Sequence, residues 1–268
     1  MSTTRDLILA TKAALSPARV GTYELAAAAR TADDPSAVAL YAWNATVSAA
    51  LMAPIHICEV VVRNCVSDAL EAVYGPRWPW DPTFLLSLPD IYGHYNPRRD
   101  LRTVALAQPT TGKVIPELKF VFWQEMFTKR HDTRIWKPHL KRVFPGHDPA
   151  KSVVALRKKI YADLGEIREL RNRIAHHEPI FTRRLSEDFE ILVELVRLKC
   201  QLVASWMVGN QNADALIARP PMFKGGKLWQ PSHDEIASIA YCLWCAGGKK
   251  ENSADEDWAN AEKILSNP

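Results

Sequence analysis

PAKSVVALRKKIYADLGEIRELRNRIAHHEP, residues 149–179, is the stretch that decides the fold. Its apolar residues recur every three or four positions, which is the spacing of one buried face of an α-helix. These residues are Val153, Leu156, Ile160, Leu164, Ile167 and Ile174. Asp148-Pro149 is typical of a helix start, and Pro179 disfavours the α conformation at Glu178. The stretch therefore predicts one long amphipathic helix that begins at Pro149 and ends near His177.

Helix signals continue on both sides of this stretch. Of the 268 residues, 47% are hydrophobic and 24% are charged, and only 11 are glycine, which argues against a β-rich fold. Further helices are expected at residues 34–54, 54–74, around 116 and 186–208. Pro54 is expected to interrupt the first two of these, and Gly75 to end the second. The predicted fold class is all-α.

Residues 76–112 are the least regular part of the chain. Six prolines punctuate an aromatic-rich stretch, which predicts an insertion packed by its own aromatic rings. Trp78 or Trp80 is a candidate for stacking on an unpaired base. The stripe of Phe120, Trp123 and Phe127 that follows the insertion is expected in the core.

The chain is expected to form two domains. Residues 1–222 form the large helical domain, residues 223–231 a linker, and residues 232–268 a C-terminal helical hairpin. Ser232-x-x-Glu235 and Ser253-x-x-Glu256 have the pattern of capping boxes, which would open the two helices of the hairpin.

Composition favours a cytoplasmic protein without membrane association. The mean hydropathy is −0.17, no uninterrupted apolar stretch approaches the roughly 20 residues of a membrane span, and the N-terminus lacks the order of a signal peptide. The five cysteines predict no disulfide framework. Cys58 and Cys65, seven residues apart, are expected as buried thiols, and Cys242-x-x-Cys245 with His233 is only part of a zinc site.

Positive charge is concentrated in the middle of the chain. Residues 76–230 carry 26 basic and 16 acidic side chains, a balance of +10, whereas residues 231–268 carry 3 and 7, a balance of −4. A basic field attracts phosphate backbones, so the sum over this segment predicts a nucleic-acid partner. Each basic run by itself is better explained as a solvated helix face.

The residues best suited to chemistry stand at the end of the predicted long helix. Asn172 and His176 are four positions apart and share one helix face, and Arg171 borders that face. Arginine can hold a phosphate, and histidine can transfer protons near neutral pH. Such a set could bind and cleave RNA, since that reaction needs proton transfer and positive charge at the phosphorus.

A structural explanation of the same residues stays open. Basic side chains at a helix C-terminus complement the helix dipole, and His176-His177-Glu178-Pro179 could serve as a cap. The spacing of Arg and His also recurs at Arg134 with His139 and at Arg142 with His147, although prolines interrupt both pairs.

The segment Leu170-Arg171-Asn172-Arg173-Ile174-Ala175-His176-His177-Glu178-Pro179-Ile180-Phe181 closely resembles the signature of the Abi-like (abortive-infection) proteins of the HEPN ribonuclease superfamily. The resemblance covers about residues 15–222 and includes four further landmarks in order. These are Leu40-Tyr41-x-Trp43-Asn44, Glu59-Val60-Val61-Val62-Arg63-Asn64, Leu118-x-Phe120-x-Phe122-Trp123 and Ile135-Trp136-Lys137-Pro138.

The resemblance implies a HEPN-type helical bundle that dimerises and cleaves RNA without a metal or other cofactor, in a toxin-like or antiphage role. It makes Arg171, Asn172 and His176 the candidate catalytic residues. The supporting candidates are His177, Glu178, Arg173, Glu59, Arg63 and Asn64. Arg63-Asn64 echoes Arg171-Asn172 and is expected to face it across the bundle, although a structural Glu59–Arg63 salt bridge is the stronger reading of that pair. An antitoxin, a guide RNA or another regulatory partner is compatible with this role.

Residues 232–265 resemble a separate small domain of unknown function found at the end of many bacterial proteins. The matching residues are Ile236-Ala237-x-x-Ala240-Tyr241-x-x-Trp244, Gly247 and Asp257-Trp258-x-x-Ala261-Glu262. This resemblance points to an interaction or regulatory hairpin and to no chemistry.

Two other functions compete with the ribonuclease. One is a non-catalytic RNA-binding or regulatory module that keeps the Arg/His pocket for binding alone. The other is a metal-dependent hydrolase using His176, His177 and Glu178, which the roughly 100° between adjacent helical side chains disfavours.

Overall fold

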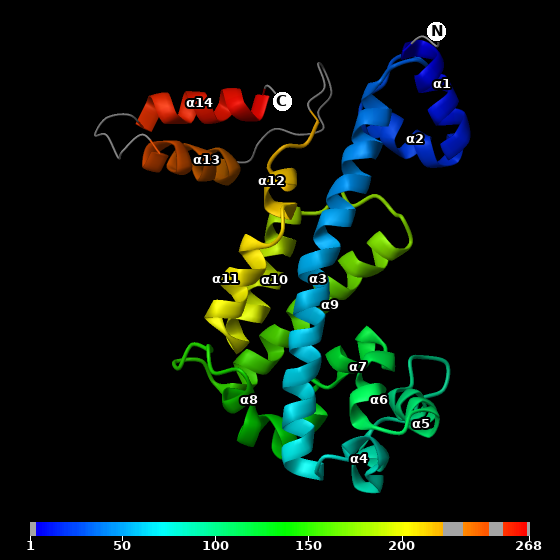
Figure 1. Ribbon diagram of the computed structural model, residues 1–268, viewed down its shortest axis with the longest axis vertical. Coiled ribbons are helices and arrows are strands. Elements are labelled where there is room, and N and C mark those ends of the chain that lie inside the picture. The colour runs from blue at the N-terminus through cyan, green and yellow to red at the C-terminus, as the bar shows by residue number, and fades with distance from the viewer. Residues whose placement is uncertain (1–3, 222–232, 247–253, 267–268) are drawn as a thin grey trace. The chain divides into compact units, whose positions relative to one another are not determined.

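The computed structural model describes residues 4–221, 233–246 and 254–266, and these residues form helices without any strand (Figure 1). The predicted all-α class is confirmed. The first helices are α1 (Thr4–Leu15), α2 (Pro17–Ala26) and α3 (Ser36–Tyr74). The middle of the chain forms η1 (Trp78–Trp80), α4 (Pro82–Ser87), α5 (Pro97–Ala107), α6 (Thr111–Glu117), α7 (Phe120–Glu125), η2 (Lys129–His131), η3 (Asp132–Trp136) and α8 (Lys137–Val143). The remaining helices are α9 (Val153–Ala175), α10 (Leu185–Lys199), α11 (Gln201–Gly209), α12 (Ala213–Ile217), α13 (His233–Ala246) and α14 (Ala254–Ser266).

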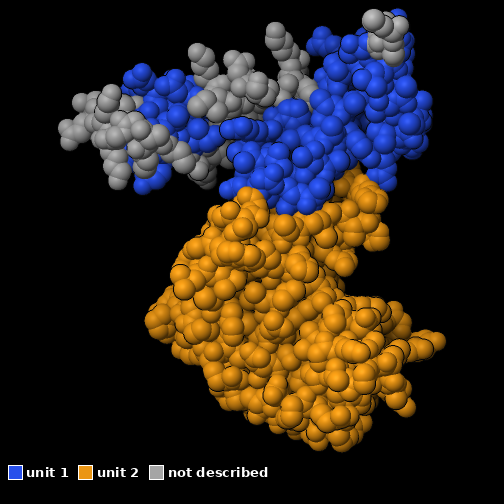
Figure 2. All heavy atoms as spheres, viewed as in Figure 1, with its two compact units in different colours: residues 1–50, 212–268 blue, residues 51–211 orange. Residues whose placement is uncertain are grey.

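The chain divides into two compact units, shown in blue and orange in Figure 2. Unit 1 comprises residues 1–50 and 212–268, and unit 2 comprises residues 51–211. Within unit 1, the Trp43 indole nitrogen donates a hydrogen bond to the Leu216 carbonyl at 2.9 Å. The division therefore groups the end of the predicted 1–222 domain with its beginning. All candidate site residues lie in unit 2.

The C-terminal hairpin has a small core of its own. Helices α13 and α14 pack against each other through Ile236, Ala240 and Ala261, and Trp258 covers this cluster. The predicted linker, residues 223–231, lies outside the described residues. So do the predicted caps Ser232 and Ser253, and the side chains of Cys242, Cys245 and His233.

Helix α3 runs through Pro54 without a break, so the predicted interruption is wrong. A proline inside a helix costs about 3 kcal/mol. The buried face of α3 in unit 2 offsets this cost: Leu51, Ile55 and Val62 are each at most 2% exposed. Burial of one such side chain contributes roughly 1.5–3 kcal/mol, so packing outweighs the lost hydrogen bond.

The start of α9 is later in the chain than predicted. Ser152 caps the helix, because its hydroxyl oxygen accepts a hydrogen bond from the Ala155 N–H at 3.2 Å. Asp148-Pro149 forms a turn instead, in which the Asp148 carboxylate accepts from the Ala150 N–H at 2.9 Å. The helix therefore begins at Val153 and not at Pro149.

The predicted helix at 186–208 is two helices, α10 and α11, which meet at Cys200 in an extended conformation. Next to this break, the Leu198 carbonyl accepts a hydrogen bond from the Gly146 N–H at 2.9 Å. A Cβ atom on Gly146 would lie 2.5 Å from the Arg197 carbonyl oxygen. Only glycine therefore permits this approach of the 143–147 turn to α10.

The insertion at 76–112 is more helical than predicted, since it contains η1, α4, α5 and the first two residues of α6. Its aromatic packing agrees with the prediction: Trp78 and Phe84 are fully buried and meet edge to face at 5.6 Å. Trp78 also contacts Trp123 of α7 at 6.4 Å, which anchors the insertion to the core. The expected core stripe is confirmed, because Phe120, Trp123 and Phe127 are at most 8% exposed.

Among the described residues, one helix, α3, is long and apolar enough to cross a membrane. Its most apolar window has a mean hydropathy of 1.7 and is 33% buried. Polar residues such as Ser48, His56 and Glu59 interrupt the segment, so no unbroken apolar run reveals it. A core helix of a soluble protein meets the same criterion, and the structure is compatible with a soluble protein.

The cysteines of α3 are buried thiols, as predicted. Cys58 and Cys65 are free and at most 1% exposed, and the Cys65 thiol donates to the Val143 carbonyl at 3.5 Å. Burial raises the pKa of Cys65 to about 12 and also raises the pKa of Cys58. Both thiols therefore stay protonated at neutral pH.

The Gly146→Ala substitution is expected to lower the free energy of unfolding by about 1–3 kcal/mol, because the new methyl group meets the Arg197 carbonyl. Gly112→Ala in α6 is the matched control, since a Cβ there meets nothing within 4 Å. It should be neutral or stabilising by up to about 1 kcal/mol. Urea unfolding followed by circular dichroism measures both, and equal midpoints would contradict the close approach.

Candidate functional site

The candidate site is built on the last turns of α9. The buried row of this helix includes Leu164, Ile167 and Leu170, which are 0% exposed and fix the rotation of the helix in unit 2. The helix ends at Ala175, and His176 is its C-cap. The end of the helix is therefore where Pro179 predicts it.

The chain leaves α9 through two reverse hydrogen bonds. The His177 N–H donates to the Ile174 carbonyl at 3.0 Å, and the Glu178 N–H donates to the Arg173 carbonyl at 2.8 Å. This pattern is a Schellman motif, and His177 takes its left-handed position with φ of +56°. Glycine is usual there because a side chain costs roughly 1–2 kcal/mol in this conformation. His176 and His177 consequently do not continue a regular helix.

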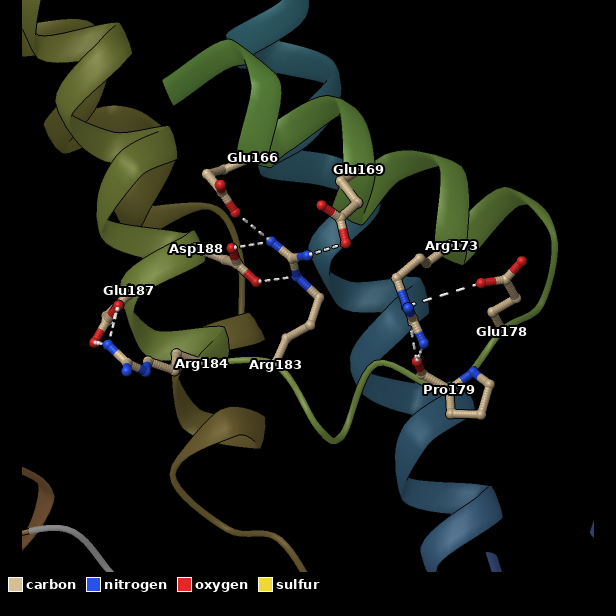
Figure 3. Close-up of polar contacts among 9 residues, drawn as sticks. All are labelled: Glu166, Glu169, Arg173, Glu178, Pro179, Arg183, Arg184, Glu187 and Asp188. Atoms are coloured by element: carbon tan, nitrogen blue, oxygen red, sulfur yellow. Dashed lines mark hydrogen bonds and ion pairs between the residues drawn. The ribbon is translucent and has the colours of Figure 1, made fainter. Parts of the chain in front are cut away.

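Arg173 holds the chain that follows the helix (Figure 3). Its guanidinium donates two hydrogen bonds to the Pro179 carbonyl, at 3.1 and 2.7 Å, and lies 3.9 Å from the Glu178 carboxylate. Arg173 and Glu178 thus have a structural function in closing the helix end.

Arg183 fixes the far end of the same loop. Two parallel hydrogen bonds of 2.8 Å join its guanidinium to Asp188, and Glu166 and Glu169 of α9 each lie 3.0 Å from it (Figure 3). Its side chain is 14% exposed and that of Asp188 is 6% exposed. The paired carboxylates raise the pKa of Arg183, with Asp188 as the main cause. This network ties α10 to α9 and neutralises the two acidic residues that precede the motif.

The side chains of Arg171, Asn172 and His176 lack the contacts with described residues that hold Arg173 and Arg183. Asn172 and His176 are exposed and Arg171 is half-buried. In the described part of the chain, none of the three side chains forms a hydrogen bond or an ion pair. Asn172 and His176 are about 40° apart around the helix axis, and Arg171 is about 100° from Asn172. A phosphate beside Asn172 and His176 is within reach of the long Arg171 side chain.

Arg168 is a further basic residue at this site that the sequence motif does not include. It precedes Arg171 by three residues, so the two lie about 60° apart on the helix. Arg168 is half-buried, and it has no acidic partner among the residues described. Its i,i+3 spacing to Arg171 and i,i+4 spacing to Asn172 could have revealed it.

Glu59 and Arg63 form an ion pair on one face of α3, as the structural alternative predicted. Their side chains are 14% and 17% exposed, and the Arg63 Nε atom is buried without a hydrogen-bond partner in the part of the chain described. Asn64 is exposed. Arg63 is therefore committed to Glu59.

The Glu59–Arg63 pair does not lie beside Arg171, Asn172 and His176. The half of α3 in unit 2 runs antiparallel to α9 (Figure 1). The pKa of Cys58 is raised by burial, by the charge of Glu59 and by the charge of Asp163. Because Asp163 acts on Cys58, the two residues lie near each other. Arg171 lies eight residues beyond Asp163, and Arg63 lies five residues beyond Cys58 in the opposite direction. About 20 Å along the helix axes therefore separates Arg63 from Arg171.

Unit 2 has cavities of about 580 and 940 Å³, and no residue from 168 to 178 lines either of these two. Asn172 and His176 are exposed at the surface of unit 2. The described residues also contain no group of three or more His, Cys, Asp or Glu side chains that could hold a metal ion.

The larger cavity is a basic groove formed by residues 90–96, helix α5 and Lys119. Its charged lining residues are Asp90, His94, Arg98, Arg99, Asp100, Arg102 and Lys119. Arg98 pairs with Asp90 at 3.4 Å and Lys119 with Asp100 at 3.5 Å, whereas Arg99 and Arg102 are exposed and lack an acidic partner in the described chain. Tyr92 in the lining is 98% exposed. The groove therefore offers two unpaired guanidinium groups and an open aromatic ring.

The two tryptophans proposed for base stacking have other contacts. Trp78 is buried, and its indole nitrogen donates to the Ser67 hydroxyl at 3.1 Å. Arg77 covers one face of Trp80 at 4.6 Å, and the Trp80 indole donates to the Ala105 carbonyl at 2.8 Å. Trp78 cannot stack on a base, and Tyr92 is the more accessible ring.

Comparison with known families identifies one segment. Residues 231–266 match the family described as a protein of unknown function (DUF2934), which covers the C-terminal hairpin and no candidate site residue. The searches of curated proteins and of solved structures found no match.

Replacing Arg183 is expected to destabilise unit 2 strongly. Arg183→Ala should cost roughly 3 kcal/mol, because it leaves the buried Asp188 carboxylate without its cation. Arg184→Ala is the matched control: its pair with Glu187 is 82% and 64% exposed, and its loss should cost less than about 0.5 kcal/mol. Urea unfolding measures the difference. A similar small effect of both variants would show that the network contributes little.

Proposed function

We propose that this chain is a metal-independent endoribonuclease with Arg171, Asn172 and His176 as its catalytic residues. By resemblance to the abortive-infection proteins, it has a toxin-like or antiphage role in the cytoplasm. The observation that supports this proposal is the contrast at the end of α9. Arg173 and Arg183 are used to hold the structure, whereas Arg171, Asn172 and His176 are left available to a ligand.

The proposed chemistry uses these three side chains directly. The 2′-hydroxyl oxygen attacks the adjacent phosphorus while its proton passes to an imidazole, and the bond from phosphorus to the 5′ oxygen breaks as that oxygen receives a proton. Arg171 and Asn172 bind the phosphate oxygens, where negative charge increases in the transition state. The products are a 2′,3′-cyclic phosphate and a 5′-hydroxyl end.

A homodimer would complete this site. One chain supplies a single His176, whereas the reaction is served best by separate proton donor and acceptor groups. A two-fold axis beside His176 would add the second Arg171, Asn172 and His176.

The second candidate is a non-catalytic RNA-binding module. The exposure of Asn172 and His176 favours it, since an exposed amide and imidazole can contact a phosphate without enclosing the bond that would react. The basic groove with Arg99 and Arg102 supplies a surface for the phosphate backbone in either case. Retention of RNA binding without cleavage by the wild-type protein would select this function.

His176→Ala is expected to reduce cleavage of total RNA about 10²–10⁴-fold, because it removes the proton-transferring group. His139→Ala is the control, since His139 belongs to an Arg/His pair in α8 that a proline interrupts. RNA binding should remain in both variants, and chelation of divalent metal should leave wild-type cleavage unchanged. Mapping of the product ends decides the chemistry: 3′-hydroxyl products or loss of activity with the chelator would contradict it.

Mixing wild-type and His176→Ala chains tests the composite site. If one cleft needs both imidazoles, an equal mixture with complete subunit exchange should keep about a quarter of the wild-type activity, because only wild-type pairs cleave. Independent sites would keep about half. Sedimentation at the assay concentration is the second measurement, and a monomer that cleaves at full rate would exclude the composite site.

A further inference from the structure

The smaller cavity of unit 2, of about 580 Å³, is a separate feature that the motif does not use. It lies where Tyr74 at the end of α3, helix α4 and the segment η2–η3 meet. Arg130, His131 and Arg134 line it on one side, and Thr83 and Ser87 of α4 line it on the other. Its volume is within the range of about 300–1,000 Å³ that is usual for small-molecule sites.

The charge of this cavity is positive. Two arginines are among its lining residues and no carboxylate is. Asp132, the acidic residue next to His131, is 8% exposed and points to Arg157, whose Nε lies 2.6 Å from it. Arg134 is exposed and has no acidic partner in the described part of the chain. An anion is the ligand that this lining favours.

His131 is the most informative residue in the lining. It is only 4% exposed, and its imidazole forms no hydrogen bond to any residue described in the structure. Burial, followed by the charge of Arg130, lowers its pKa to about 4, so the ring is neutral at physiological pH. Neither ring nitrogen of His131 is among the fully buried polar atoms without a partner, so the ring keeps some access to the cavity that it lines. This ring lines the cavity and can donate one N–H to a bound anion.

The segment η2–η3, which carries the two arginines of the cavity, is held by buried contacts. η3 is a π-helix, a rare form that is found frequently at functional sites. Ile135 and Trp136 of this turn are fully buried, and Trp136 stacks on Phe127 at 4.4 Å with an interplanar angle of 8°. The Arg130 guanidinium donates to the Ser87 carbonyl at 2.7 Å, which joins η2 to α4. The Arg130 guanidinium is thus positioned before any ligand arrives.

We propose that this cavity binds a phosphorylated ligand of nucleotide size. Arg130 and Arg134 hold the phosphate, the His131 imidazole donates one hydrogen bond to it, and the Thr83 hydroxyl binds a further oxygen, whereas the Ser87 hydroxyl already donates to the Phe84 carbonyl at 2.7 Å. The half-buried Tyr74 ring, which packs against Phe84 at 5.0 Å, borders the space left for the rest of the ligand.

This site is distinct from the proposed ribonuclease site. Tyr74 lies sixteen residues beyond Cys58 on α3, and Arg171 lies eight residues beyond Asp163 in the opposite direction, so about 35 Å separates them along the helix axes. Figure 1 shows α4 and the end of α9 at opposite ends of unit 2. The proposal therefore goes beyond the proposed function and holds whether or not the chain cleaves RNA.

The phosphate could come from a free nucleotide or from the phosphorylated 5′ end of an RNA. Isothermal titration of the full-length wild-type chain separates these sources. The probes are adenosine monophosphate, adenosine, and a short oligonucleotide with either a 5′-phosphate or a 5′-hydroxyl. Binding of the monophosphate identifies a nucleotide site. Binding of the 5′-phosphorylated oligonucleotide alone identifies an RNA-end site.

Arg134→Gln is the decisive variant, because Arg134 is exposed and its loss should leave the fold intact. It should weaken binding of the phosphorylated probe about tenfold or more, the effect of losing one charged hydrogen-bond donor. Arg184→Gln removes the same charge at an 82% exposed position outside this cavity and outside the basic groove, and it should leave this binding unchanged. Unchanged circular dichroism checks the fold of both. Equal binding of adenosine and its monophosphate, equal binding by Arg134→Gln and wild type, or no binding of either phosphorylated probe at millimolar concentration would overturn the proposal.

Discussion

A guanidinium that is largely buried needs negative charge around it. At Arg183 this need determines how the loop beside the candidate site is attached to its two helices. Its carboxylate partners come from two helices, Glu166 and Glu169 from α9 and Asp188 from α10. The ion pairs therefore fix where the connecting loop enters α10. Arg173 fixes where it leaves α9, through the Pro179 carbonyl. With both ends held, the backbone of the last α9 turn and of the loop keeps one conformation, and the side chains of the motif extend from fixed positions on it.

The parts of the fold that depend on local sequence were predictable, and those that depend on tertiary contacts were not. Pro179 ends α9 because it restricts the backbone conformation of Glu178, the residue before it. This one residue was therefore enough to predict the end of the helix. Pro54 failed as a signal because burial of the α3 face outweighs a local cost. No glycine or proline marks the helix break at Cys200 in the sequence. The break lies next to the hydrogen bond between the Leu198 carbonyl and the Gly146 N–H, and Gly146 is more than 50 residues earlier in the chain.

The same distinction applies to the site. Sequence identified a cluster of basic residues, but Arg171 and Arg173 look alike in a motif and differ only in the structure, where the Pro179 carbonyl lies within reach of one of them. Helical spacing could have added Arg168. It could not have shown that Arg63 is paired with Glu59 and distant from Arg171, since that depends on the antiparallel packing of α3 and α9.

The buried thiols of α3 make the stability of unit 2 measurable without any substitution. A thiol reagent attacks the thiolate, and neither Cys58 nor Cys65 presents one while the helix is packed. Each modification event therefore records a molecule in which α3 has separated from its neighbours. Rates of labelling under native conditions report local opening in the way that hydrogen exchange does, but at two named points of the helix that runs beside α9. The labelling rate of these two thiols thus measures how often the core of unit 2 opens.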